Sequence, residues 1–580
     1  MKIAKMESIN ISKKQIIYIS PEYGYDENIN NYAGGLGILA GDYLKEASDK
    51  NLPIIAVGLF YKEGYFTQSF DINFDQVSEK SNLDYDAKSY EILKENGSTK
   101  IFEIKLGIGI IKFKVIKTKI KNVDLYLIDS NVEDNYLFTD TTNMLYTPSR
   151  KQRLLQEILL GQGAIMLLEY LKIQIEVLHI NEGHAAFALL ERINQLADIN
   201  NDFELSIKTI KKTNFFTTHT PIIHGNEEFD IELIKEVLTA SSLLRYLSIN
   251  KFCELGITPD NKSFSMTVLA IKLSEKFNSV SKLHQKVATK MWKVIDENIK
   301  FENVTNGIYV DDWLAPEIET AIKGNDNQSE NLINAKKSLK KRIIIKLNQN
   351  NFYNKSESLI ELYKNTNIGD NSFIIGFARR FAPYKRANLL FSDIKYLKKF
   401  FINNPQVVLI ISGKAHPADV DGKKIIKDIL TQIRDNNLNN NIIFIENYNI
   451  KIAKSIIWAS DIWLNNPIRG LEACGTSGMK AAINASINYS VLDGWWDEAY
   501  SDSIGFKIAN RRINKLPDNE IAKIILDELE NKIIPMSANT IQWSKLIMKS
   551  TKTIMQRFTT ERMLADYLKI YDSLLSNRNL

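Results

Sequence analysis

The fold is decided by residues 471–483, which read Leu-Glu-Ala-Cys-Gly-Thr-Ser-Gly-Met-Lys-Ala-Ala-Ile. The apolar run Ile462-Trp463-Leu464-Asn465 precedes this stretch, and good helix formers follow its two glycines. That order predicts a strand, a Gly-rich turn and the start of a helix, where free N–H groups favour a bound phosphate. If Thr476 opens the helix, Lys480 lies on the same face. The lysine then suits a phosphate clamp or a Schiff base, and a tight turn with a solvated lysine is the alternative.

The composition is that of a soluble globular protein with more than one lobe. The chain has 580 residues, 44% of them hydrophobic and 25% charged, which is too long for one ordinary core. A formal net charge of +5 over this length is weak evidence for a nucleic-acid partner. Two cysteines, no signal-peptide pattern in residues 1–14 and no apolar run of membrane-spanning length predict a cytoplasmic protein without a membrane partner.

Short β-type runs alternate with helical patterns along most of the chain. Near-continuous apolar strands with intervening helices predict parallel sheets covered on both faces. The expected class is therefore α/β, with two doubly wound Rossmann-like lobes facing a central cleft. The polar stretch 324–332 suggests a division into residues 1–325 and 326–580, the second lobe carrying helices at its end. The expected strands are 15–20, 53–60, 124–129, 175–180, 214–218, 373–377, 407–412, 442–446, 461–464 and 489–492.

Candidate site residues of the first lobe gather where its strands are expected to end, which is where doubly wound folds bind ligands. Residues 33–42, Ala-Gly-Gly-Leu-Gly-Ile-Leu-Ala-Gly-Asp, form a second phosphate-type turn, for which a purely structural turn is the alternative. His184 and His219 each follow an expected strand. No Gly-x-Ser-x-Gly elbow supports a hydrolase triad, and no cysteine cluster supports a zinc site.

The second lobe opens its strand-end chemistry with residues 379–386, Arg-Arg-Phe-Ala-Pro-Tyr-Lys-Arg. Four cations in eight residues repel one another unless an anion joins them, and a phosphate-bearing ligand is the natural anion. A basic helix start on the surface is the alternative. Further along, Trp495 and Trp496 stand beside carboxylates, which suits either a sugar-lined cleft or lobe packing.

With these motifs in place, the sequence resembles the α-glucan (glycogen, starch or maltodextrin) phosphorylase family, in a short bacterial-type form. The resemblance runs from Pro21-Glu22-Tyr23 and Gly34-Gly35-Leu36-Gly37 to Asp493-Gly494-Trp495-Trp496. Its most specific segment is residues 472–480, which looks like the lysine motif that binds pyridoxal 5′-phosphate in that family. The family implies a glycosyltransferase of GT-B architecture in carbohydrate metabolism.

The resemblance also implies roles for individual residues. Lys480 would carry the cofactor covalently, and Arg380 and Lys385 would bind the substrate phosphate, over which Gly34 and Gly35 would close. Residues implied around the cofactor are Lys480, Gly475, Thr476, Ser477, Arg379, Tyr448 and Gly35. Residues implied around the substrates are Gly34, Gly35, His219, Asn278, Glu472, Gly475, Arg380 and Lys385. Those implied in catalysis are Lys480, Arg380, Lys385 and His219, with no metal.

The implied reaction is reversible phosphorolysis of terminal α-1,4-linked glucose from glycogen or maltodextrin. It gives α-D-glucose 1-phosphate with retention, the cofactor phosphate acting as acid and base toward inorganic phosphate. Cys474 stands where a serine is expected and Arg379 where many members have a lysine. The resemblance allows a homodimer and implies that allosteric control is absent. The alternatives are a nucleotide-sugar-dependent glucan synthase of the same architecture and a glucan-binding protein without catalysis.

Overall fold

The computed structural model describes residues 15–577 apart from 27–28, 30, 82–89, 261, 325–326 and 354. The amino-terminal residues 1–14, on which the signal-peptide expectation depends, lie outside the described residues. The described chain divides into two compact units. Unit 1 comprises residues 1–65, 80–305 and 560–580, and unit 2 comprises residues 66–79 and 306–559.

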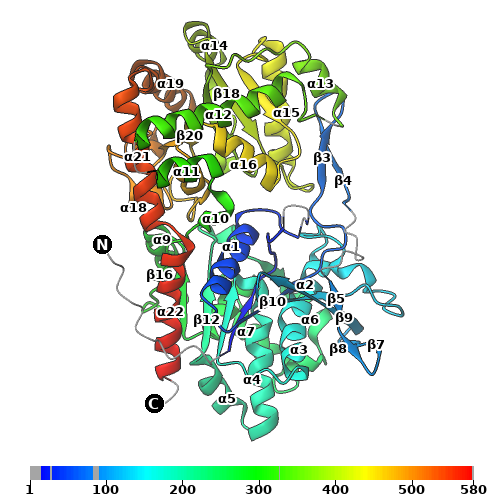
Figure 1. Cartoon of the computed structure of the whole chain (residues 1–580). Helices are drawn as coiled ribbons and strands as arrows, with labels where there is room; N and C mark the ends of the chain where they lie inside the picture. The colour runs from blue at the N-terminus through cyan, green and yellow to red at the C-terminus, as the bar shows by residue number, and fades with distance from the viewer. Residues whose placement is uncertain are drawn as a thin grey trace. The chain divides into compact units, whose positions relative to one another are not determined.

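A ten-stranded, mostly parallel sheet forms the core of unit 1 (Figure 1). Its strand order is β16-β15-β12-β11-β1-β2-β10-β9-β5, with β8 paired to β9, and the pairs from β16 through β10 are parallel. Numbered along the chain, the six strands from β10 to β15 read 3-2-1-4-5-6, which is the doubly wound order. The strand bounds are β1 Ile16–Ile19, β2 Ile54–Leu59, β5 Glu91–Ile92, β8 Phe102–Leu106, β9 Gly109–Ile120, β10 Val123–Asp129, β11 Val177–Asn181, β12 Asn214–Thr217, β15 Lys276–Ser279 and β16 Glu302–Asn303.

Helices cover this sheet, and the last helix of the chain is one of them. In α22, Tyr567 and Tyr571 pack against Tyr43 of α1 and the ring of His179 on β11, and all four side chains are buried. Figure 1 shows α1 in blue beside α22 in red. The helix bounds of unit 1 are α1 Gly35–Asp49, α2 Arg150–Ile158, α3 Ala164–Tyr170, α4 Phe187–Asn200, α5 Phe203–Lys211, α6 Ile231–Leu238, α7 Ile249–Gly256, α8 Met266–Lys272, α9 Lys282–Trp292 and α22 Thr560–Asn577.

Unit 2 repeats the same topology with a six-stranded sheet that is parallel throughout. Its order, β19-β18-β17-β20-β21-β22, also reads 3-2-1-4-5-6 along the chain. Strands β17, β18 and β19 are buried at every position, as expected for a sheet covered on both faces. The strand bounds are β17 Phe373–Ala378, β18 Val407–Ser412, β19 Ile442–Ile445, β20 Ile462–Asn465, β21 Ile487–Ser490 and β22 Gly505–Lys507.

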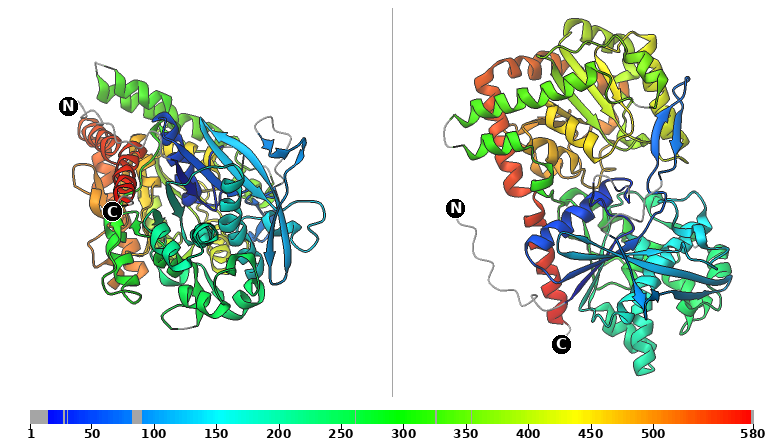
Figure 2. Two further views of the ribbon diagram at one scale, coloured as in Figure 1. Left: turned by 90° about the horizontal axis from the view of Figure 1, so that it is seen from below. Right: turned by 45° about the vertical axis from the view of Figure 1, so that its right-hand side comes forward.

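The helices of unit 2 lie around this sheet, and a hairpin from early in the chain joins them. Gln68 in the hairpin donates to the carbonyl oxygen of Gly413 and Gln76 to that of Ala415. Figure 2 shows this hairpin in blue beside the green and yellow helices. The bounds are β3 Thr67–Phe70, β4 Gln76–Glu79, α10 Val310–Trp313, α11 Pro316–Lys323, α12 Gln328–Asn348, α13 Glu357–Tyr363, α14 Ile394–Asn403, α15 Val420–Asp435, α16 Ile450–Ala459, α17 Ser477–Ile483, α18 Trp496–Ala499, α19 Asp518–Glu528, α20 Ile534–Ala538 and α21 Thr540–Arg557.

The prediction of two doubly wound α/β lobes is confirmed. The division of the chain differs from the expected 325/326 boundary, because the hairpin of residues 66–79 pairs with unit 2 and α22 buries its aromatic face in unit 1. These are long-range contacts that local composition does not register. The expected polar boundary also falls partly inside α12, and the last expected strand, 489–492, is two residues late. None of the described helices has the length and apolar character needed to cross a membrane.

Candidate functional site

In both units the candidate residues follow the central strands of a doubly wound sheet. The order reverses between β1 and β11 in unit 1 and between β17 and β20 in unit 2. Ligands of such sheets bind outside the carboxyl ends of the strands at this reversal. Arg379 directly follows β17, and the segment that leads to Lys480 follows β20.

The basic segment 379–386 of unit 2 is organised around one buried carboxylate, that of Glu472. Arg379 donates to both carboxylate oxygens of Glu472 and also to the side-chain oxygen of Asn465, while Lys385 Nζ donates to Glu472 Oε1 at 2.9 Å. Arg386 is buried and donates to the carbonyl oxygens of residues 466 and 467, so it is structural. The four cations of residues 379–386 were expected to need an anion beside them. The Glu472 carboxylate supplies part of that negative charge.

Arg380 differs from its neighbours in this segment. Its side chain is exposed, and no hydrogen bond or ion pair is recorded for it with the described residues. Arg379, by contrast, is buried, and its Nε has no hydrogen-bond partner among the described residues. The segment thus retains an exposed guanidinium and a buried N–H group, both able to bind a further acceptor.

The charges at this site determine the ionisation of two neighbouring groups. Burial raises the pKa of Glu472, but the positive charges of Arg379 and Lys385 outweigh that effect and bring it to about 2. Burial raises the pKa of Tyr448 to about 12, against an opposing effect of the Arg379 charge. At neutral pH, Glu472 is therefore a carboxylate and Tyr448 a neutral phenol able to donate a hydrogen bond.

The turn of residues 474–478 is held by close backbone approaches. Gly475 has a φ of +84°, and a Cβ there would lie 2.6 Å from Glu472 Oε1. Gly494 has a φ of +50° and lies so close to the Cys474 carbonyl that an added Cβ would be 2.2 Å from its oxygen. Trp463 Nε1 lies 3.2 Å from Ser477 Oγ, to which it donates. Glycine is therefore required where the turn passes Glu472.

Lys480 lies in α17, and only 6% of the residue is exposed. Its Nζ is 3.6 Å from the centre of the Trp313 ring, which is a close cation–π contact. Asn484 donates from Nδ2 to the carbonyl oxygen of Lys480 and to that of Trp313, both at 2.8 Å. The amine is thus buried against an aromatic wall, which excludes the solvated-lysine alternative.

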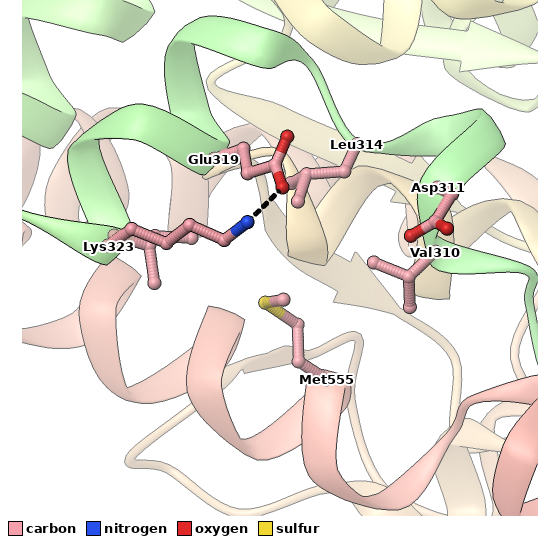
Figure 3. A pocket seen from close by; sticks show the side chains of 7 residues that line it. Val310, Asp311, Leu314, Glu319, Lys323 and Met555 are labelled. Carbon is pink, nitrogen blue, oxygen red and sulfur yellow. Dashed lines mark hydrogen bonds and ion pairs between the residues drawn. The ribbon is translucent and has the colours of Figure 1, made fainter.

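Helix α10, which carries Trp313, also borders a cavity (Figure 3). Val310, Asp311 and Leu314 line it together with the Glu319–Lys323 ion pair of α11 and Met555 of α21. The cavity holds about 470 Å³. Trp313 is not among the residues that line this cavity, and its ring contacts Lys480 Nζ. α10 therefore carries both the ring that contacts Lys480 and residues that line this cavity.

In unit 1, the Gly-rich turn is tied to Glu22, which follows β1. The Glu22 carboxylate accepts from the backbone N–H groups of Ala33 and Gly34 and from the hydroxyl of Tyr146. Helix α1 begins at Gly35, has no acidic residue in its first turn, and leaves open space around Gly34 and Gly35. The start of this 15-residue helix therefore has the polarity that favours an anion.

His219, two residues beyond β12, is held by Asn181, the last residue of β11, and by Glu182, which follows it. Its Nε2 lies 2.7 Å from Asn181 Oδ1, and its backbone N–H donates to Glu182 at 2.6 Å. Because an amide oxygen only accepts, Nε2 carries the proton. Burial, with a smaller effect from His284, lowers the pKa of His219 to about 3. The ring is therefore neutral at physiological pH, and its Nδ1 is an acceptor.

Asn278 lies beneath this surface rather than on it. The residue is fully buried; its Oδ1 accepts from the Thr217 hydroxyl, and its Nδ2 donates to the carbonyl oxygen of Ser279. Its own carbonyl oxygen accepts from the backbone N–H of Thr218, the residue before His219. Asn278 therefore supports His219 through the backbone and is not open to a ligand.

A cluster of Glu157, His184 and Glu227 in unit 1 brings three possible metal ligands within 4.8 Å of one another. Glu227, however, forms ion pairs with Arg150 and Arg153, and His184 Nε2 lies 3.5 Å from the same carboxylate. Two arginines already neutralise this carboxylate, and a divalent cation would have to lie beside them. The cluster therefore has the character of an ion-pair network rather than of a metal site.

Several organising residues escaped the sequence reading. Glu22 lies in a segment of the family resemblance but was given no role there, and Glu182 and Trp313 carry no motif, because all three roles depend on contacts with distant segments. Glu182 has a φ of +76°, a strained conformation of the kind that occurs at functional sites. A polar residue two positions after an expected strand was the available signal for Glu22 and Glu182, and Trp313 gave none.

Comparisons with known proteins converge on one family. The model of the family described as carbohydrate phosphorylase matches residues 167–499. The chain is similar to the maltodextrin phosphorylase of Thermococcus litoralis, with 35% identity over 97% of this chain and 71% of that protein. It is also similar to the glycogen phosphorylase of Aquifex aeolicus, with 33% identity over 97% of this chain and 87% of that protein. The glycogen phosphorylase of Mycobacterium tuberculosis is 32% identical over 96% of this chain and 70% of its own length.

Proposed function

The chain belongs to the carbohydrate phosphorylase family, and from that premise we propose that it is an α-glucan phosphorylase. The reaction is the reversible phosphorolysis of terminal α-1,4-linked glucose from glycogen or maltodextrin. Inorganic phosphate is the acceptor, and α-D-glucose 1-phosphate forms with retention. The observation that carries this proposal is the buried Lys480 amine on a helix that follows a Gly-rich turn and a cationic cluster.

We propose pyridoxal 5′-phosphate as the cofactor, because the chemistry of the residues fits this group. Lys480 supplies a primary amine shielded from water, and the Trp313 ring beside it can pack against an aromatic cofactor ring. Arg379 Nε is a buried donor without a partner among the described residues. The residues proposed to hold the cofactor are Lys480, Gly475, Thr476, Ser477, Arg379, Tyr448 and Gly35. When bound, the cofactor would supply a second phosphate as proton donor and acceptor toward the substrate phosphate.

In unit 2, Arg380 and Lys385 are proposed to bind the substrate phosphate. The exposed guanidinium of Arg380 offers a bidentate contact, and Lys385 adds a point charge. In the described conformation Lys385 donates to Glu472, so phosphate binding redistributes its hydrogen bonds. Two phosphate groups near each other repel by several kcal/mol at intermediate dielectric, which explains the number of cations. A phosphate anion also stabilises the positive charge that develops on the sugar ring.

In unit 1, His219 is proposed to contact the glucosyl unit at the cleavage point. Because Nε2–H donates to Asn181, the deprotonated Nδ1 would accept a hydrogen bond from a sugar hydroxyl such as the hydroxymethyl group. Asn278 would assist by holding the backbone before His219. Gly34, the N-cap of α1, and Gly35, its first residue, are proposed to contribute to phosphate binding, with the Gly34 N–H exchanging its hydrogen bond to Glu22 for one to the phosphate. In unit 2, Glu472 is proposed to accept a hydrogen bond from the sugar, and Gly475 is proposed to pack against it.

The decisive experiment measures phosphate-dependent release of glucose 1-phosphate from maltoheptaose and records the absorption spectrum of the purified chain. Activity that requires phosphate, together with an absorption band that changes on borohydride reduction, supports the proposal. A colourless protein that does not respond to pyridoxal 5′-phosphate and extends glucan from a sugar nucleotide would establish the synthase alternative. Glucan binding without either reaction would indicate a protein without catalysis.

A further inference from the structure

Asn484, at the end of α17, joins two segments that are distant in sequence. It is fully buried, and its Nδ2 donates to the carbonyl oxygens of Lys480 and Trp313 at 2.8 Å each. Its Oδ1 accepts from the backbone N–H of Ala315, also at 2.8 Å. One amide side chain thus forms hydrogen bonds with the backbone of Trp313 and Ala315 and with the backbone of Lys480 in α17.

Lys336 of α12 holds Asn484 from the other side. It is 5% exposed, and its Nζ donates to the carbonyl oxygens of Asn484 and Trp458 and to Ser486 Oγ, at 2.9, 2.8 and 2.9 Å. Trp458 in turn donates from Nε1 to the carbonyl oxygen of Trp313 at 2.9 Å. These bonds close a ring of contacts that leads from Lys336 to the Trp313 segment by two routes.

The charge state of Lys336 follows from its surroundings. Burial lowers its pKa to about 7, with Asp461 raising it and Lys340 lowering it. Asp461 is itself paired with Lys340 at 2.8 Å and accepts from the backbone N–H of Ile374. Three acceptors around Nζ match the three N–H donors of an ammonium group, so the charged form fits the geometry.

This network of hydrogen bonds supports the position of the Lys480 side chain, which is flexible on its own. A lysine amine sits on a flexible four-carbon stem, so its location depends on what surrounds it. The Lys480 Nζ lies 3.6 Å from the Trp313 ring, and Asn484 binds the backbone at both partners of that contact. Loss of the Asn484 hydrogen bonds would therefore free the Trp313 ring and the Lys480 amine to move apart.

We propose that Asn484 and Lys336 are positioning residues that hold the Lys480 amine against the Trp313 ring. The inference rests on the proposed function, in which Lys480 carries the cofactor. Neither residue touches the amine; Asn484 acts through the backbone of Lys480 and Trp313, and Lys336 acts through Asn484 and Trp458.

The test uses the full chain loaded with pyridoxal 5′-phosphate, with the absorption spectrum and the affinity of the bound cofactor as readouts. Asn484→Ala is expected to shift the absorption band and to weaken cofactor affinity about tenfold or more, because three hydrogen bonds to the backbone are lost. Lys336→Met is expected to change the absorption band and the cofactor affinity in the same direction as Asn484→Ala, but to a smaller extent. Lys336→Arg is expected to bring both closer to the wild-type values than Lys336→Met does.

Two controls separate positioning from general loss of stability. Asn194→Ala removes a fully buried amide that donates to the Leu243 carbonyl in unit 1, and Lys340→Met removes the ion pair with Asp461 on the same helix as Lys336. Both are expected to lower the unfolding midpoint and leave the cofactor spectrum unchanged. A wild-type spectrum and affinity in Asn484→Ala, or in Lys336→Met if Asn484→Ala does not fold, would overturn the inference. A wild-type chain that never takes up the cofactor would instead overturn the proposed function.

Discussion

Lys385 Nζ donates a hydrogen bond to Glu472 Oε1 at 2.9 Å, across 87 positions of sequence. Arg379 donates to the same carboxylate, so two cations share one buried anion. This arrangement stores positive charge at the end of a buried strand without leaving it uncompensated in the absence of a ligand. It also predicts that Glu472 matters to the stability of unit 2.

Glu472→Gln is expected to destabilise unit 2 by about 3 kcal/mol at neutral pH, because it leaves the buried Arg379 and the half-buried Lys385 without their charged partner. The measurement is the urea unfolding midpoint. The matched control is Glu79→Gln, which removes an exposed ion pair with Lys355 in the same unit and is expected to cost less than about 1 kcal/mol. Equal effects of the two substitutions would contradict the role given to Glu472.

The same carboxylate predicts a pH dependence of stability. The pKa of Glu472 is about 2 in the folded chain against an ordinary value of 4.5. A depressed pKa gives a contribution that is complete above about pH 4.5 and is lost as the pH falls toward 2. The unfolding midpoint of the wild type is therefore expected to fall over this window more steeply than that of Glu472→Gln. Parallel curves for the two proteins would show that Glu472 is not the group concerned.

The backbone of the turn gives a prediction that depends on one atom. Gly475→Ala places a Cβ 2.6 Å from Glu472 Oε1 at a φ of +84°, so both strain and displacement of the carboxylate are expected. Gly470→Ala is the matched control, because its φ is +91° and no atom lies within 4 Å of the added Cβ. Gly470→Ala should cost about 1 kcal/mol of backbone strain. Gly475→Ala should cost more and should also reduce catalysis of phosphorolysis.

The overall architecture could be predicted because the strands and helices of doubly wound lobes have recognisable patterns in the local sequence. Strands such as Val407–Ser412 are apolar up to their last residue, are buried on both faces, and stand between helical patterns. The carboxyl ends of these strands then indicate where candidate residues gather. The assignment of Thr560–Asn577 to unit 1 could not be predicted, because an amphipathic helix does not state which sheet its apolar face will cover.

The candidate site was only partly accessible from the sequence for a similar reason. Residue types around Lys480 indicated a phosphate-binding turn, but the partner of each cation depends on segments that fold back from far away. Glu472 as the partner of Arg379, and Trp313 as the wall beside Lys480, are contacts of that kind. Asn278 shows the reverse case, since the family resemblance gave it a candidate role although the sheet buries it fully.

Arg380 and Arg386 are expected to separate binding from stability. Arg380→Ala should raise the KM for inorganic phosphate about tenfold to a hundredfold, through loss of charge-assisted hydrogen bonds, and should leave the unfolding midpoint unchanged because the side chain is exposed. Arg386→Ala should lower the unfolding midpoint and leave the KM for inorganic phosphate unchanged, because its buried guanidinium binds the carbonyl oxygens of residues 466 and 467. Phosphate kinetics that do not change in Arg380→Ala would exclude this residue from the phosphate site.

Lys480 allows charge and covalent chemistry to be tested apart. Lys480→Ala is expected to lose both the cofactor and phosphorolysis, since no other amine is proposed to bind it. Lys480→Arg keeps a cation that can remain over the Trp313 ring but lacks the primary amine, so it should retain more stability than Lys480→Ala and still bind no cofactor covalently. Mass spectrometry after borohydride reduction measures the covalent link on the peptide that contains residue 480. Covalent labelling at another lysine, with wild-type turnover in Lys480→Arg, would show that the amine of α17 is not the attachment point.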